Sequence, residues 1–191
     1  MQKKINIARI VQGMAAVGII ASMSPAMAAD GQISFSGKVL TTTCSIGAGG
    51  GASGGKDMTV KLPSVSAGTL ASAGSVAGRT PFSIVLSGCT GDSTKVSTVF
   101  EAGDTVDAGS GRLNLVSAGA DDTVAKNVQI NLLNDKQAPI VAGAASGQQN
   151  SQSVALTDGG ATLNYFAEYY ATGKSAAGSA NTRVQYSLDY Q

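Results

Sequence analysis

The stretch Val184-Gln-Tyr-Ser-Leu-Asp-Tyr-Gln191, at the C-terminal end of the sequence, alternates apolar or aromatic residues with polar ones. A period of two places the apolar side chains on one face of a β-strand. Similar alternation occurs upstream, over residues 33–39, 59–62, 82–87, 128–132, 154–156 and 163–169. Clusters of Gly, Ser, Asp and Asn separate these segments, at 47–55, 67–78, 103–111 and 142–150. Many short strands joined by turns predict an all-β antiparallel sandwich or barrel, without a domain boundary or internal repeat.

The composition excludes most hydrolytic and metal chemistry. The 191 residues include no His, no Trp and two Cys, and only 13% of the residues are charged. Without His the chain has no Ser–His triad and no His-bearing zinc site. The net charge is only +1, and no Lys/Arg cluster occurs beyond the first nine residues, which argues against nucleic-acid binding. We therefore expect no cofactor, no metal and no nucleic-acid partner.

The first 28 residues predict a secretory signal peptide. Three basic residues among the first nine precede an apolar stretch over 10–23, and the small-x-small site Ala26-Met27-Ala28 follows. The apolar stretch is shorter than the roughly 20 residues that a transmembrane helix needs. Cleavage after Ala28, with Ala29 as the near alternative, leaves a mildly acidic exported chain.

The two cysteines are predicted to form a structural disulfide. Export brings Cys44 and Cys89 into an oxidising compartment, where an isolated pair normally forms a bridge. They lack the C-x-x-C spacing of a redox-active pair. The bridge closes a loop of about 46 residues, for which the loss of chain entropy corresponds to roughly 4 kcal/mol.

One segment resembles the start of a nucleotide-binding loop. The run Gly50-Gly-Ala-Ser-Gly-Gly55-Lys56 fits G-x-x-x-x-G-K, but Asp57 stands where that motif requires Ser or Thr. A carboxylate at that position repels phosphate, and no strand-then-helix pattern surrounds the run. We therefore predict a flexible surface loop and no nucleotide partner.

Both ends of the exported chain are unusual. All five Tyr lie beyond residue 164, and Tyr186 and Tyr190 share one face of the last predicted strand. Such aromatic residues can fill a core, but this does not explain why the chain ends at Gln191, within the strand. At the other end, the predicted strand over 33–39 begins almost at the new N-terminus. A terminal strand in a sheet is common, so this feature alone decides nothing.

In order and spacing these segments resemble the major shaft pilins of chaperone–usher fimbriae, close to the type 1 fimbrial subunits. The resemblance covers the whole exported chain. The matching stretches are G-x-I-x-F-x-G-x-V at 31–39 with Cys44 following, GRTPFSIVLSGC at 78–89, YFAEYYATG at 165–173 and VQYSLDYQ at 184–191. The departures are a longer Gly-rich loop after Cys44 and the presence of Asp189 in the last strand.

The resemblance implies an incomplete immunoglobulin-like antiparallel sandwich that lacks its last strand, which a donor strand from another subunit supplies. Residues 29–40 would form this donor-strand extension and residues 41–191 the pilin body. The donor face would consist of Ile33, Phe35, Gly37 and Val39. The groove that accepts the neighbour's donor strand would include Val184, Tyr186, Leu188 and Tyr190. A periplasmic chaperone would occupy this groove before assembly and bind the C-terminal carboxylate of Gln191.

The implied function is that of a structural subunit of a surface fimbria, exported through the periplasm and an outer-membrane usher. Subunits would polymerise head-to-tail by donor-strand exchange, and the homopolymer would contribute to cell adhesion. A contact between two different surfaces generates an open filament when its rotation does not close.

Three other functions are weaker. A minor or adaptor pilin is poorly separated from a shaft subunit by sequence alone. A single-domain carbohydrate-binding adhesin is disfavoured, because the family's adhesins have a lectin domain before the pilin domain and lack a donor extension. An enzyme would rest on carboxylates in Gly- and Ser-rich segments, where turns are the commoner role; these are Asp104, Asp107, Asp121 and Asp122.

Overall fold

The computed structural model describes residues 32–37 and 39–191, so the signal peptide predicted at 1–28 lies outside the described residues. The chain divides after Gly37 into two units. The described part of the first unit, residues 32–37, forms no strand or helix, and no strand pair includes it. No helix among the described residues has the length and apolarity to cross a membrane.

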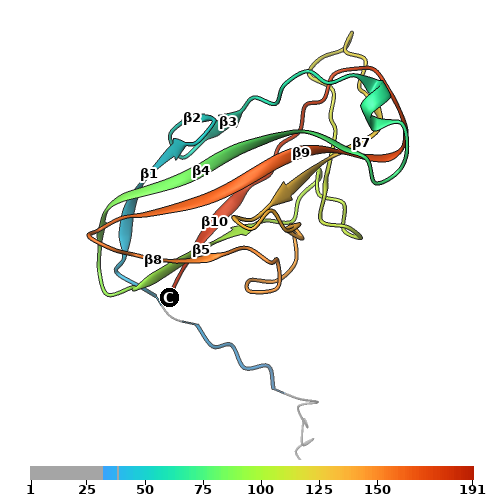
Figure 1. Ribbon diagram of the computed structural model, residues 1–191. Coiled ribbons are helices and arrows are strands. Elements are labelled where there is room, and N and C mark those ends of the chain that lie inside the picture. Colours follow the sequence, from blue (N-terminus) through green and yellow to red (C-terminus); the bar gives the residue numbers. More distant parts are fainter. Residues whose placement is uncertain (1–31, 38) are drawn as a thin grey trace, which may run out of the picture. The chain divides into compact units, whose positions relative to one another are not determined.

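The second unit is built from antiparallel β-strands (Figure 1). Its larger sheet has five strands in the order β1 (Thr43–Gly49), β4 (Val76–Thr90), β9 (Ala161–Ala176), β7 (Lys126–Leu133) and β6 (Leu113–Asn114). Its smaller sheet has the order β10 (Tyr186–Tyr190), β5 (Lys95–Phe100) and β8 (Ser153–Ala155). A separate hairpin pairs β2 (Ala52–Gly54) with β3 (Met58–Val60). All pairs of named strands are antiparallel, which confirms the predicted all-β antiparallel fold.

The hydrophobic core lies between the five-stranded and the three-stranded sheet. Tyr165 of β9 is fully buried, and its ring centroid lies 5.4 Å from that of Phe82 in β4. On its other side it lies 5.3 Å from Phe100 of β5, edge to face. Because β5 belongs to the smaller sheet, these three rings join the layers, and aromatic pairs in this geometry add to the energy of burial. Further buried residues of this core are Ile84, Leu86, Val96, Leu113, Ile130, Leu132 and Leu163.

The structure corrects four details of the strand assignment. The described residues of the segment 33–39, predicted as a strand, form none, because no neighbouring strand pairs with them. The segment 47–55, predicted as a loop, forms the end of β1 and all of β2. Gly49 pairs with Ser83 in β1. A Cβ at this position would lie 3.1 Å from the Val85 side chain, so glycine suits the close packing there. The cluster 67–78 holds a 3-10 helix, η1 (Ala67–Leu70), and the start of β4. The sequence analysis also missed β5, whose Val96, Thr98 and Phe100 are all buried.

The larger sheet carries an ion pair whose carboxylate is buried. Glu168 of β9 is only 3% exposed, and its Oε2 accepts a hydrogen bond from Arg79 Nε of β4 at 2.8 Å. Its Oε1 accepts from Asn131 Nδ2 of β7 at 3.2 Å. These contacts tie three neighbouring strands of the sheet together. A buried carboxylate is tolerated because it is paired and hydrogen-bonded.

We expect Arg79→Ala to lower the free energy of unfolding by about 1–3 kcal/mol, because it leaves the carboxylate of Glu168 with a single amide donor. The value is below that of a fully buried pair because the Arg79 side chain is 38% exposed. A matched control is Arg183→Ala, since Arg183 pairs with Asp104 where both side chains are exposed. It should cost less than about 1 kcal/mol. Urea unfolding of the two variants tests this, and equal losses would contradict it.

Candidate functional site

A groove with a cavity volume of about 840 Å³ runs beside β10. From β10 and the residues before it, Val184, Tyr186, Leu188 and Tyr190 line it, each half-buried. The core residues that reach it come from both sheets and include Phe82, Ile84, Phe100, Leu113, Ile130 and Leu132. The remaining apolar lining comes from β1 and the β3 region, as Ile46, Met58, Val60 and Leu62. The groove therefore gives access to the apolar interior of the sandwich.

The edge of β10 at this groove is unpaired. β10 is the terminal strand of its sheet and pairs only with β5. The backbone of Gln191 exchanges hydrogen bonds with Lys95, and Gln185 O accepts from Glu101 N. The backbone N–H and C=O groups of successive residues point to opposite edges of a strand. Because Gln185 and Gln191 bond to β5, the residues at the alternate positions direct these groups to the open edge. These residues are Tyr186, Leu188 and Tyr190, the same ones whose side chains line the groove.

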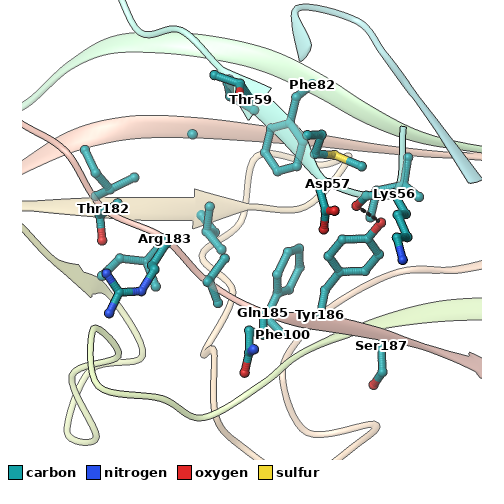
Figure 2. A pocket seen from close by; sticks show the side chains of 18 of the residues that line it. Lys56, Asp57, Thr59, Phe82, Phe100, Thr182, Arg183, Gln185, Tyr186 and Ser187 are labelled. Carbon is teal, nitrogen blue, oxygen red and sulfur yellow. Dashed lines mark hydrogen bonds between the residues drawn. The ribbon is translucent and has the colours of Figure 1, made fainter. Parts of the chain in front are cut away.

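A tyrosine reaches across the mouth of the groove (Figure 2). The Tyr186 hydroxyl donates a hydrogen bond of 2.7 Å to the carbonyl oxygen of Lys56, in the turn of the β2–β3 hairpin. Burial raises the pKa of the Tyr186 phenol, and the nearby Asp57 carboxylate raises it further. The phenol therefore keeps its proton and remains a donor at neutral pH. Burial also raises the pKa of Tyr190.

The structure brings four of the five predicted acceptor residues together along this groove, as described above. Gln191 does not line it; it is exposed, and its backbone holds the end of β10 against β5. The sequence analysis missed the contributions of Ile46, Met58 and the core residues. The alternation around Phe82 and Ile130 indicated buried faces, but a single strand pattern does not show which faces meet at a groove.

The predicted donor residues are highly exposed within the described part of the chain. Ile33 is 80% exposed, Phe35 92% and Val39 97%, and Gly37 is also exposed. Isolated exposed apolar residues are ordinary, but these three lie two and four positions apart in one segment, on the same face of an extended chain. Such a segment offers apolar side chains on one face if it becomes a strand.

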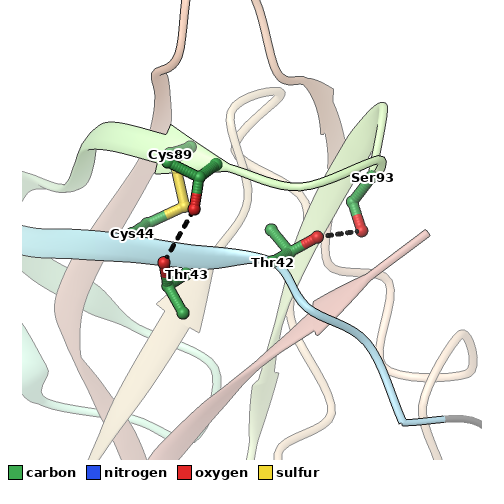
Figure 3. The surroundings of a disulfide bond; sticks show 6 residues. Thr42, Thr43, Cys44, Cys89 and Ser93 are labelled. Carbon is green, nitrogen blue, oxygen red and sulfur yellow. Dashed lines mark hydrogen bonds between the residues drawn. A yellow bond between two sulfur atoms is a disulfide. The ribbon is translucent and has the colours of Figure 1, made fainter.

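The predicted disulfide between Cys44 and Cys89 is present and joins β1 to β4 (Figure 3). It lies where the register of these two strands shifts, between Thr43 and Ser45. Two hydroxyl contacts flank it. Thr43 and Thr90 share a hydrogen bond of 2.9 Å, and Thr42 Oγ1 donates to Ser93 Oγ at 2.8 Å. The bridge thus fixes β1, one of the strands that contributes to the groove, to its neighbour β4 in the larger sheet.

Three of the four carboxylates considered for an enzyme accept hydrogen bonds within the body. Asp107 accepts hydrogen bonds from the backbone and hydroxyl of Ser110, which lower its pKa. Asp122 accepts from Ala118 N and Ser179 Oγ, which lower its pKa as well. In the part of the chain that the structure describes, no group of three or more Cys, Asp or Glu could hold a metal ion. The segment that resembles a nucleotide-binding loop forms the β2–β3 hairpin.

Comparison with known proteins identifies one kind of relative. The family described as Type-1 fimbrial protein, A (FimA) matches residues 62–191, more than half of the chain. The chain is 51% identical over 170 residues to the major fimbrial subunit SMF-1 of Stenotrophomonas maltophilia strain K279a, which covers 86% of this chain and 95% of that protein. It is 43% identical over 183 residues to the F17 fimbrial protein of Escherichia coli, which covers 92% and 96% respectively.

A solved structure agrees with the fold. The P pilus rod subunit PapA has a TM-score of 0.52 and 18% identity to this chain, over 78% of this chain and 99% of PapA. At that identity the similarity supports the sandwich fold alone. The match over 62–191 and the identity to two fimbrial proteins carry the assignment further: the chain belongs to the type-1 fimbrial protein family, close to the pilins that its sequence resembles.

Proposed function

We propose that this chain is a structural fimbrial subunit that polymerises head-to-tail by donor-strand exchange. Residues 29–40 of one subunit add as a strand to the open edge of β10 in the next subunit. The side chains of Ile33, Phe35 and Val39 then fill the groove, and Gly37 leaves room where the two backbones approach closely. The observation that supports this best is the one-sided pairing of β10 beside an open apolar groove.

The two surfaces match in length and period. Residues 33–39 carry apolar side chains at every second position except Gly37, and the apolar residues that line the groove from 184–190 also recur at every second position. Each segment spans about 20 Å when extended, at roughly 3.3 Å per residue. A strand added at an open edge satisfies the backbone groups, while pockets take the alternate side chains.

Two terms favour this contact. Burying Ile33, Phe35 and Val39 contributes about 1.5–3 kcal/mol for each side chain. Each backbone hydrogen bond to Tyr186, Leu188 or Tyr190 adds roughly 1 kcal/mol net. Donor and acceptor are different surfaces, so the contact repeats along an open filament.

An open strand edge beside apolar side chains is also an aggregation hazard that natural proteins cover. We therefore include in the proposal a periplasmic chaperone that occupies the groove before assembly. An outer-membrane usher then exchanges it for the next subunit's extension. The finished fibre contributes to cell adhesion, as the resemblance in sequence implies.

Phe35→Asp tests the donor role. A carboxylate cannot enter the apolar groove without losing its hydration, so this variant should be exported but should yield no fibres. The matched control is Ser36→Asp, which adds the same charge to the neighbouring residue on the opposite face and should leave the fibre yield largely intact. Electron microscopy of fibres sheared from the cell surface, with SDS-resistant ladders on a gel, measures both. Normal fibres from Phe35→Asp, or equal loss in both variants, would contradict the proposal.

A further inference from the structure

The β2–β3 hairpin is attached to the body differently from the other strands. Its two strands pair only with each other, in the register Ala52↔Val60 and Gly54↔Met58. It follows β1 through Gly50, whose φ of +70° and close approach to Ser83 suit only glycine. After Val60, residues 61–66 have no assigned secondary structure. The hairpin is therefore held to the sandwich by side-chain packing rather than by a ladder of backbone hydrogen bonds.

The hairpin lies against the same groove that β10 borders. Met58 and Val60 are half-buried and line the groove, and both pack against the main core. Lys56 and Asp57, in its turn, are exposed and line the groove as well. The hydrogen bond from Tyr186 to Lys56 joins the hairpin to β10 over 130 residues of sequence, at an exposed position (Figure 2).

This hydrogen bond connects β10 to the β2–β3 hairpin, the two elements between which an added strand has to lie. A donor strand that pairs with the open edge of β10 must lie between β10 and the hairpin. The phenol of Tyr186 spans this space at the groove mouth, and its oxygen is held by the carbonyl of Lys56 at 2.7 Å. A strand that pairs with Tyr186 at this point must displace the bond.

From this geometry, and resting on the proposed function, we infer that the β2–β3 hairpin is a lid that the Tyr186–Lys56 hydrogen bond latches over the vacant groove. The latch opens when a donor strand enters, and the hairpin then moves away from β10. The closed lid holds Met58 and Val60 against the core in the unassembled subunit. It also slows the entry of any strand that binds too weakly to displace it.

Tyr186→Phe removes the latch while retaining the aromatic ring. We place it in the full-length chain carrying Phe35→Asp, so that the subunits cannot polymerise. The probe is a synthetic peptide with the sequence of residues 31–40. Loss of one neutral hydrogen bond should raise the open fraction, and with it the rate of peptide insertion, about fivefold. The matched control is Tyr170→Phe on β9, which removes the same hydroxyl group from a tyrosine whose ring packs against Arg112 and which does not line the groove.

Hydrogen exchange of the same proteins separates the lid from the groove. If the inference holds, Tyr186→Phe raises exchange in residues 52–60, and peptide binding raises it in the parent chain while protecting the amides of Tyr186, Leu188 and Tyr190. Protection of these amides with no change in residues 52–60, or equal insertion rates in the two Tyr variants, overturns the lid and leaves the groove as proposed. If the peptide protects no β10 amide, the groove accepts no strand, and the lid is overturned together with the proposed function.

Discussion

Leu188→Asp should abolish fibre formation, because it places a carboxylate in the middle of the groove that accepts the donor strand. Leu188 is half-buried and packs against the core at the open edge of β10. A donor strand would bury the new charge without a partner, at a cost of at least about 3 kcal/mol, which corresponds to a loss of roughly a hundredfold or more in binding. Fibre yield from the cell surface measures this effect.

Ser153→Asp is the matched control for Leu188→Asp. Ser153 is exposed on β8, in the same three-stranded sheet as β10, and it does not line the groove. The same charge at this position should leave most of the fibre yield. The level of each exported variant is measured alongside, so that loss of folding is distinguished from loss of assembly. Full-length fibres from Leu188→Asp at normal yield would contradict the role of the groove.

Replacing both Cys44 and Cys89 by Ser should lower the free energy of unfolding by about 4 kcal/mol. The bridge closes a loop between two neighbouring strands, and its loss frees the unfolded chain from that restraint. Since small domains are stable by only about 5–15 kcal/mol, the variant should also reach a lower level in the periplasm. Urea unfolding of the purified subunit gives the difference directly.

Two controls accompany the disulfide variant. The reduced parent protein should unfold at nearly the same urea concentration as the double variant, because both lack the same covalent bond. Thr43→Ala removes only the hydroxyl contact with Thr90 beside the bridge, so it should cost about 1 kcal/mol or less. A loss below 1 kcal/mol for the double variant would show that the bridge is dispensable for stability.

Family membership also shows where the protein acts in the cell. Fimbriae are surface fibres whose subunits are exported and assemble with other subunits, as the sequence predicted. The relatives are fimbrial subunits and not enzymes.

The period-two patterns were sufficient to predict the fold class, because a residue that faces a sandwich core alternates with one that faces water. The alternation at 184–190 likewise indicated which residues face the groove. The strand predicted at 59–62 corresponds to β3, but its partner β2 was missed because that Gly-rich segment carries few apolar side chains. The Tyr186–Lys56 bond could not be predicted, since nothing in either segment encodes a contact 130 residues away. By contrast, β5 has a regular alternation over 95–100 that could have been recognised.

The central claim is that each subunit has one donor and one acceptor, and co-expression of the two blocked variants tests it most directly. Phe35→Asp retains an acceptor groove without a donor, whereas Leu188→Asp retains a donor without an acceptor. Together they should form an SDS-resistant heterodimer and nothing longer, while each variant alone remains monomeric. Absence of the heterodimer, or a ladder of longer species, would contradict the account.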